Sequence, residues 1–241
     1  GDGVAEVVTQ RSLAGDEDGM RKEMREAKRP PFRYRLFRTL GDLSMAPEPY
    51  LEFNATGYAF DGDSDTPVPG GFQDLDGDGR QDLVTLTLDF SLMQAVRVLT
   101  TRRISIGLDF HVWCQNASGE YRAVPGLDLS GKFKLDLNNF KVGQLSQFAG
   151  DFDADGKADF VQMGRGRDVT IHRGREGCVY PPEPDLLIRL KEEPRDLKLV
   201  QVRDFDADEL TDLLVIQPQK VTEPGVTPPV RLDLYLSGGA Q

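Results

Sequence analysis

The chain has 241 residues, of which 39% are hydrophobic and 29% are charged, so it is long enough to bury a sizeable core. Its formal net charge of −11 argues against nucleic acid as a partner, because phosphate backbones attract basic surfaces. No run approaches the roughly 18 apolar residues of a membrane-spanning helix, so the sequence predicts no membrane span.

The first forty residues combine half of an acidic motif with a basic stretch. Asp2 and Glu6 occupy two carboxylate positions of a motif that recurs later. Residues 15–29 carry apolar residues on one helical face and stop at a pair of prolines, which predicts a short helical insertion. Residues 21–38 hold eight basic side chains. We interpret this basic stretch as a solvated helix face and a half-exposed strand, with a docking patch for an acidic partner or an anionic glycan as the alternative.

An aspartate-rich nonapeptide then occurs three times, at residues 74–82, 151–159 and 204–212. Carboxylates at its positions 1, 3, 5 and 9, with the backbone carbonyl of position 7, form an oxygen cage of the kind that Ca²⁺ prefers. The predicted ligands are Asp74, Asp76, Asp78, Arg80, Asp82, Asp151, Asp153, Asp155, Lys157, Asp159, Asp204, Asp206, Asp208, Leu210 and Asp212, joined by Asp2 and Glu6 of the half copy. Position 6 is glycine in two copies, which permits a sharp turn, and Glu209 in the third, where we expect the weakest site.

The main alternative for these loops is an EF-hand, which begins in the same way. That loop ends with a bidentate Glu at position 12 and is flanked by helices. Position 12 is Thr85, Gln162 and Val215 in the three copies, and the residues that follow are strand formers. We therefore expect each loop to connect two strands. A shorter imitation at residues 61–65 lacks the glycine and is interpreted as a solvated turn, with a cation site as the alternative.

Other segments show strand and helix patterns. Residues 91–99 begin with a capping-box pattern and predict a second helical insertion. Apolar and polar residues alternate at 104–112, 133–137 and 230–236, which predicts strands that each bury one face.

The acidic loop between two strands resembles the FG-GAP (VCBS) repeat of integrin-alpha-type β-propellers. The match is close in two copies and weaker in the third, and it covers about 20 residues of each repeat. The resemblance implies an all-β fold: a β-propeller arc of about three to four four-stranded antiparallel blades, with calcium in the hairpin between the first two strands. The repeats would span approximately residues 1–66, 67–143, 144–197 and 198–241. Because the family closes its propellers with more blades, we expect this chain to be part of a larger one.

The remaining observations concern location and function. Calcium sites of this kind indicate an extracellular, cell-surface or periplasmic address, where Cys114 and Cys178 form a disulfide or remain buried free thiols. His111 and His172 lie in strand-like runs without partners at metal or triad spacing, and we expect no enzyme. We expect a calcium-binding interaction, adhesion or scaffold module whose partner is a protein or the remaining blades. A carbohydrate-binding propeller, or the propeller of a polysaccharide-active enzyme, is the alternative.

Overall fold

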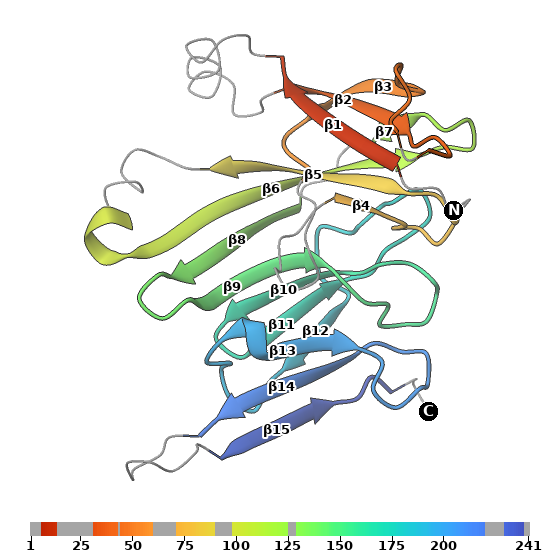
Figure 1. Ribbon diagram of the computed structural model, residues 1–241. Coiled ribbons are helices and arrows are strands. Elements are labelled where there is room, and N and C mark those ends of the chain that lie inside the picture. The colour runs from red at the N-terminus through yellow and green to blue at the C-terminus, as the bar shows by residue number, and fades with distance from the viewer. Residues whose placement is uncertain are drawn as a thin grey trace.

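The computed structural model describes residues 6–13, 31–42, 44–59, 71–89, 98–124, 129–219 and 229–238. In these residues the fold is all-β, and every pair of neighbouring strands is antiparallel. The strands form three sheets, none of which closes on itself, and Figure 1 shows them as successive layers from the N-terminal to the C-terminal part of the chain.

The first sheet contains β1 (Glu6–Ser12), β2 (Pro31–Arg38) and β3 (Leu51–Thr56), in that order. The alternation in β2 is the one that the sequence predicts. Phe32, Tyr34 and Leu36 are buried. The intervening Arg33 and Arg35 point away from this core and both pair with Glu52 of β3.

The second sheet, here called the central sheet, has nine strands. Its order is β12-β11-β10-β9-β8-β6-β5-β4, with β7 paired to β6. The strands are β4 (Gly71–Gln73), β5 (Asp82–Asp89), β6 (Arg103–Gln115), β7 (Tyr121–Ala123), β8 (Leu129–Asp136), β9 (Lys141–Phe148), β10 (Phe160–Arg165), β11 (Asp168–His172) and β12 (Leu186–Arg189).

The third sheet contains β13 (Val200–Arg203), β14 (Asp212–Pro218) and β15 (Val230–Tyr235), preceded by the 3-10 turn η1 (Leu197–Leu199). Asp196 caps this turn by accepting a hydrogen bond from the Lys198 backbone N–H. Leu197 is buried in the core that joins the third sheet to the central sheet.

Three apolar clusters hold the layers together. Tyr34 of the first sheet packs with Leu83 and Trp113 of the central sheet. Within the central sheet, aromatic residues of β6, β9 and β10 pack edge to face, with Phe110 and Phe160 ring centroids 4.9 Å apart. Between the central and third sheets, residues of β9, β10 and β11 pack against β14. Each interface buries apolar surface that would otherwise face water, which stabilises the stack.

The central sheet differs from the predicted separate blades. Strands β4, β5, β6 and β8 form one group of four and β9 to β12 another, but β8 pairs with β9 through Lys134 and Gln144 and makes a single sheet. The expected boundary between residues 143 and 144 falls within β9. The turn at residues 137–140 is short enough for β8 and β9 to pair as a hairpin, which joins the two groups.

The last strand has an exposed apolar face. Val230, Leu232, Leu234 and Leu236 are 47–61% exposed, whereas Asp233 on the other face is only 5% exposed. One face of β14 packs against the central sheet, and it includes Val215. Asp233 of β15 pairs with Val215 and therefore lies on the same face. Asp233 is accommodated on that face by Arg231 at 2.8 Å.

Some predicted features lie outside the described residues. These are Asp2, the helical insertion at residues 15–29, the imitation loop at residues 61–65 and most of the insertion at residues 91–99. The described end of the last one is helical, at residues 98–101.

Candidate metal centre

The three acidic loops occupy equivalent places. The first (74–82) joins β4 to β5, the second (151–159) joins β9 to β10, and the third (204–212) joins β13 to β14. Each pair of strands is antiparallel, so the predicted strand–loop–strand arrangement is confirmed and the EF-hand alternative is excluded. Figure 1 shows the three loops along the same edge of the stacked sheets. Glu6 of the half copy is the first residue of β1. Asp82 and Asp212, at position 9 of the first and third loops, are likewise the first residues of β5 and β14.

In each loop, backbone N–H groups donate hydrogen bonds to the carboxylate at position 1. Asp74 accepts hydrogen bonds from the backbone N–H groups of Gly77 at 2.8 Å and Gly79 at 2.8 Å. Asp151 accepts from Gly156 at 2.7 Å in the second loop. Asp204 does the same in the third, with Ala207 at 2.7 Å and Glu209 at 3.1 Å. Because each carboxylate oxygen has more than one lone pair, these aspartates can still ligate a cation.

The aspartate at position 9 has a structural role that the sequence pattern did not reveal. In the first loop Asp82 accepts from the backbone N–H of Leu75 at 2.9 Å and of Gln115 at 2.8 Å. The same two bonds recur at Asp159, with Phe152 and Gly174, and at Asp212, with Phe205 and Ser237. All three carboxyls are completely buried. Position 9 therefore ties its loop to the third strand of the same group.

Carboxylate oxygens converge in every loop. The groups whose ligand atoms lie within 4.8 Å of one another are Asp74, Asp76 and Asp78; Asp151, Asp153 and Asp159; and Asp204, Asp206 and Asp212. Position 5 joins the group only in the first loop. Position 7 is predicted to supply its backbone carbonyl. In two loops its side chain pairs with position 5: Arg80 with Asp78, and Lys157 with Asp155 at 2.9 Å.

Two buried oxygens in these groups have no hydrogen-bond partner, Asp76 Oδ1 and Asp153 Oδ1. A buried acceptor without a donor is costly, so these positions fit a ligand that supplies positive charge. Burial, followed by the neighbouring charge of Asp78, raises the pKa of Asp76, and burial followed by Asp155 raises the pKa of Asp153. Burial also raises the pKa of Asp206. The loops thus hold mutually repelling carboxylates that a cation would neutralise.

The second loop contacts the loops on either side. Thr211 of the third loop donates its backbone N–H to the Asp151 carbonyl at 2.8 Å and accepts from the Asp151 N–H through its hydroxyl at 2.7 Å. A Cβ at Gly77 of the first loop would lie 2.5 Å from the carbonyl oxygen of Gly156. Glycine at residue 77 is required both by this approach and by its φ of +74°.

A disulfide lies beside the first loop. Cys114, at the end of β6, is bonded to Cys178, and their Cα atoms are 5.9 Å apart. The neighbouring Gly177 donates its backbone N–H to Asp76 Oδ2 at 3.1 Å. The disulfide therefore holds the 175–179 turn against a predicted cation ligand.

Both histidines lie in strands, His111 in β6 and His172 in β11, and both have polar partners. His111 Nε2 lies 3.2 Å from the Thr87 hydroxyl, and His172 Nδ1 lies 2.9 Å from the Pro181 carbonyl oxygen.

Comparisons of the chain with protein-family models, with curated proteins and with solved structures gave no match. In the described part of the chain, the structure contains no helix with the length and hydropathy of a membrane-spanning segment.

Proposed function

We propose that the three acidic loops bind Ca²⁺ and that the chain is part of a calcium-stabilised interaction module. The observation that carries this proposal is the pair of buried, unpartnered oxygens, Asp76 Oδ1 and Asp153 Oδ1, each within its own group of carboxylates. The same hydrogen bond, from the N–H of position 6 to the carboxylate of position 1, recurs in all three loops and supports a common function for them.

Calcium fits these loops better than a softer metal. All the converging atoms in the three loop groups are carboxylate oxygens, which hard cations prefer, and the two cysteines near the first loop are bonded to each other. Ca²⁺ accepts irregular arrangements of oxygen ligands, whereas Mg²⁺ demands a near-ideal octahedron.

We also propose that the sheets belong to a β-propeller of the FG-GAP (VCBS) type. Support comes from two consecutive four-stranded groups, each with its acidic loop between the first two strands. The β8–β9 pairing is the departure from this architecture, since blades are normally separate sheets.

The role that we propose is binding outside the cytoplasm, on the cell surface, in the periplasm or in the extracellular space. The Cys114–Cys178 disulfide supports an oxidising compartment. The exposed apolar face of β15, with Leu232 at 61% and Leu234 at 47% exposure, supports a protein partner or a further sheet of the same propeller. Carbohydrate binding is the second candidate, favoured by a hollow on the central sheet that Ser146, Gln162 and Thr170 help to line.

Calorimetric titration of the chelator-treated protein with CaCl₂ tests the cation sites. We expect saturable binding with dissociation constants of about 10⁻⁴–10⁻³ M, and a higher melting temperature in calcium. Asp153→Asn should remove one site, and Glu183→Gln, which changes an exposed carboxylate outside the loops, should remove none. Unchanged melting in calcium, together with no binding heat, would refute the proposal.

A further inference from the structure

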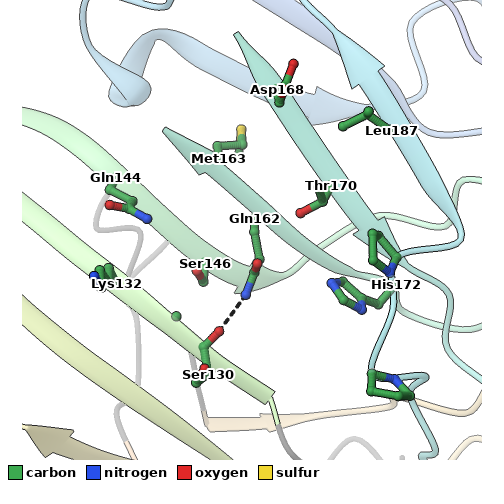
Figure 2. Close-up of a pocket in the computed structure, with 13 residues that line it drawn as sticks. Ser130, Lys132, Gln144, Ser146, Gln162, Met163, Asp168, Thr170, His172 and Leu187 are labelled. Atoms are coloured by element: carbon green, nitrogen blue, oxygen red, sulfur yellow. Dashed lines mark hydrogen bonds between the residues drawn. The ribbon is translucent and has the colours of Figure 1, made fainter. Parts of the chain in front are cut away.

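A hollow of about 440 Å³ lies on the face of the central sheet, across β8 to β12. This volume is within the range of small-molecule and cofactor sites. Figure 2 shows its lining, in which neutral hydrogen-bonding side chains lie among apolar residues. The polar members that the argument uses are Ser130, Gln144, Ser146, Gln162, Thr170 and His172.

Strand register places three of these side chains in one row. Ser146 of β9 is directly opposite Gln162 of β10, which is directly opposite Thr170 of β11. Residues directly opposite on antiparallel strands share a face and lie close together. The three side chains therefore form a row of hydroxyl and amide groups across the sheet.

Two of the amide and hydroxyl groups are buried, and the lining makes few hydrogen bonds within itself. Ser146 is 1% exposed and Gln144 is 8% exposed. Gln162 donates from Nε2 to the Ser130 carbonyl at 2.6 Å, and no other side-chain hydrogen bond joins the described residues that line the hollow (Figure 2). Buried polar groups are normally hydrogen-bonded, so this lining is suited to a polar ligand.

His172 contributes a ring nitrogen at one end of the row. Its Nδ1 faces the Pro181 carbonyl, an acceptor, so Nδ1 carries a hydrogen and Nε2 is left for a ligand. His172 is 6% exposed, and Figure 2 shows its ring beside Gln162 and Thr170. The row thus offers donors and acceptors together.

The charges near the hollow do not favour an ionic ligand. Lys132 and Asp168 are the charged residues of the lining, and their charges are opposite. Asp168 is already paired with Arg189 at 2.9 Å. With Asp168 paired, Lys132 is the charge that the lining leaves for a ligand, and the lining holds no cluster of like charges.

A peptide strand is also disfavoured. Strands β8 to β11 are each hydrogen-bonded to a neighbour on both sides, so the hollow lies on a sheet face and not at a free edge. Peptides that bind by strand addition need such an edge. Pro182, Pro184 and Leu187 add apolar surface at one end, which suits the C–H faces of sugar rings.

We infer that this hollow, here called the polar groove, binds a neutral oligosaccharide. Sugar hydroxyls both donate and accept, as the row of Ser146, Gln162 and Thr170 requires. The inference rests on the proposed binding role and names its ligand class, but it does not depend on the cation sites, because no groove residue belongs to an acidic loop.

The test is a titration of the full chain, in calcium, with cellohexaose, xylohexaose, mannohexaose and maltohexaose. We expect saturable binding of at least one, with a dissociation constant of about 1 mM or tighter, and shifts of the Gln144 and Gln162 side-chain amide signals in NMR spectra. Thr170→Val should weaken that binding about fivefold by removing one hydrogen-bonding group, and Thr170→Ser should restore it. Gln201→Ala, at an exposed amide of β13, is the matched control and should have no effect.

Absence of saturable binding to all four hexaoses would overturn the inference, and so would binding that leaves both amide signals unmoved. Binding of only a sulfated oligosaccharide or of a peptide at the groove would overturn the neutral class. The amide shifts are measured on the unaltered protein, so the test stands even if Thr170→Val does not fold. Calcium titration of the same sample separates the two proposals, because intact cation binding without oligosaccharide binding refutes only this one.

Discussion

The backbone N–H of Ala158 donates a hydrogen bond to the carbonyl oxygen of Leu75 at 3.0 Å. Ala158 occupies position 8 of the second loop and Leu75 occupies position 2 of the first. Thr211, at position 8 of the third loop, makes a similar bond to the carbonyl of Asp151, at position 1 of the second loop. We therefore expect that a cation which orders one loop would favour the binding geometry of the next.

We expect cation binding at neighbouring loops to be coupled. Asp76→Asn removes a ligand from the first loop, and it should also weaken calcium binding at the second loop several-fold, because the first loop is then less ordered. NMR titration with the Gly156 amide as the reporter measures this. Glu183→Gln provides the control, and an unchanged second-loop affinity in Asp76→Asn would show that the loops act independently.

Glu209 should weaken the third loop through its backbone. Its φ is +72°, whereas Gly79 and Gly156, at the same position of the other loops, have φ of +82°. Such a conformation is strained for a residue with a Cβ. We expect Glu209→Gly to raise the free energy of unfolding by about 1 kcal/mol, measured by urea denaturation.

The reciprocal change isolates the backbone effect. A Cβ at Gly156 would meet nothing within 4 Å, so Gly156→Ala adds strain without a clash. It should destabilise by a similar amount. A neutral effect of both substitutions would contradict this explanation.

The metal-free protein should lose stability as the pH rises. Burial raises the pKa of Asp82 and of Asp159 from 3.8 to about 6. Between about pH 4 and pH 6 the folded state then binds more protons than the unfolded state, so the contribution of these carboxyls to stability falls with increasing pH. Urea denaturation in chelator at several pH values measures the trend.

Comparison with Asp159→Asn separates this contribution from those of other groups, because the variant cannot ionise at that residue. The stability difference between the two proteins should change across this pH window. Calcium should suppress the change, since it binds the ionised carboxylates. A difference that does not vary with pH would contradict the prediction.

Removal of the disulfide should affect stability and the first loop together. The bond joins residues 64 apart in sequence, and such cross-links stabilise by about 2–4 kcal/mol. Cys114→Ser with Cys178→Ser should lower the free energy of unfolding by that amount. Because Gly177 donates to Asp76, the double variant should also weaken calcium at the first loop more than at the third. Equal weakening at both loops would indicate a general effect of stability.

Local sequence patterns predicted the acidic loops and several of the strands. The spacing of aspartates and the β-branched residues after them predicted three strand–loop–strand units, because the ligands of one loop and the period of one strand are contiguous in sequence. The half-exposed strand expected within residues 21–38 is β2, in which Phe32, Tyr34 and Leu36 are buried and alternate with arginines, since side chains alternate along any strand.

Relations between distant segments were decided only by the tertiary structure. Asp82 was predicted as a ligand, but its bond to Gln115 depends on how β5 pairs with β6. The alternation at 230–236 predicted a strand with two different faces, but the packing of β14 on the central sheet decided that the apolar face of β15 is exposed. The polar groove escaped sequence analysis because Ser146, Gln162 and Thr170 are ordinary strand residues, and only strand register brings them into one row. Register and sheet packing arise from the summed contacts of many residues, which no short motif encodes.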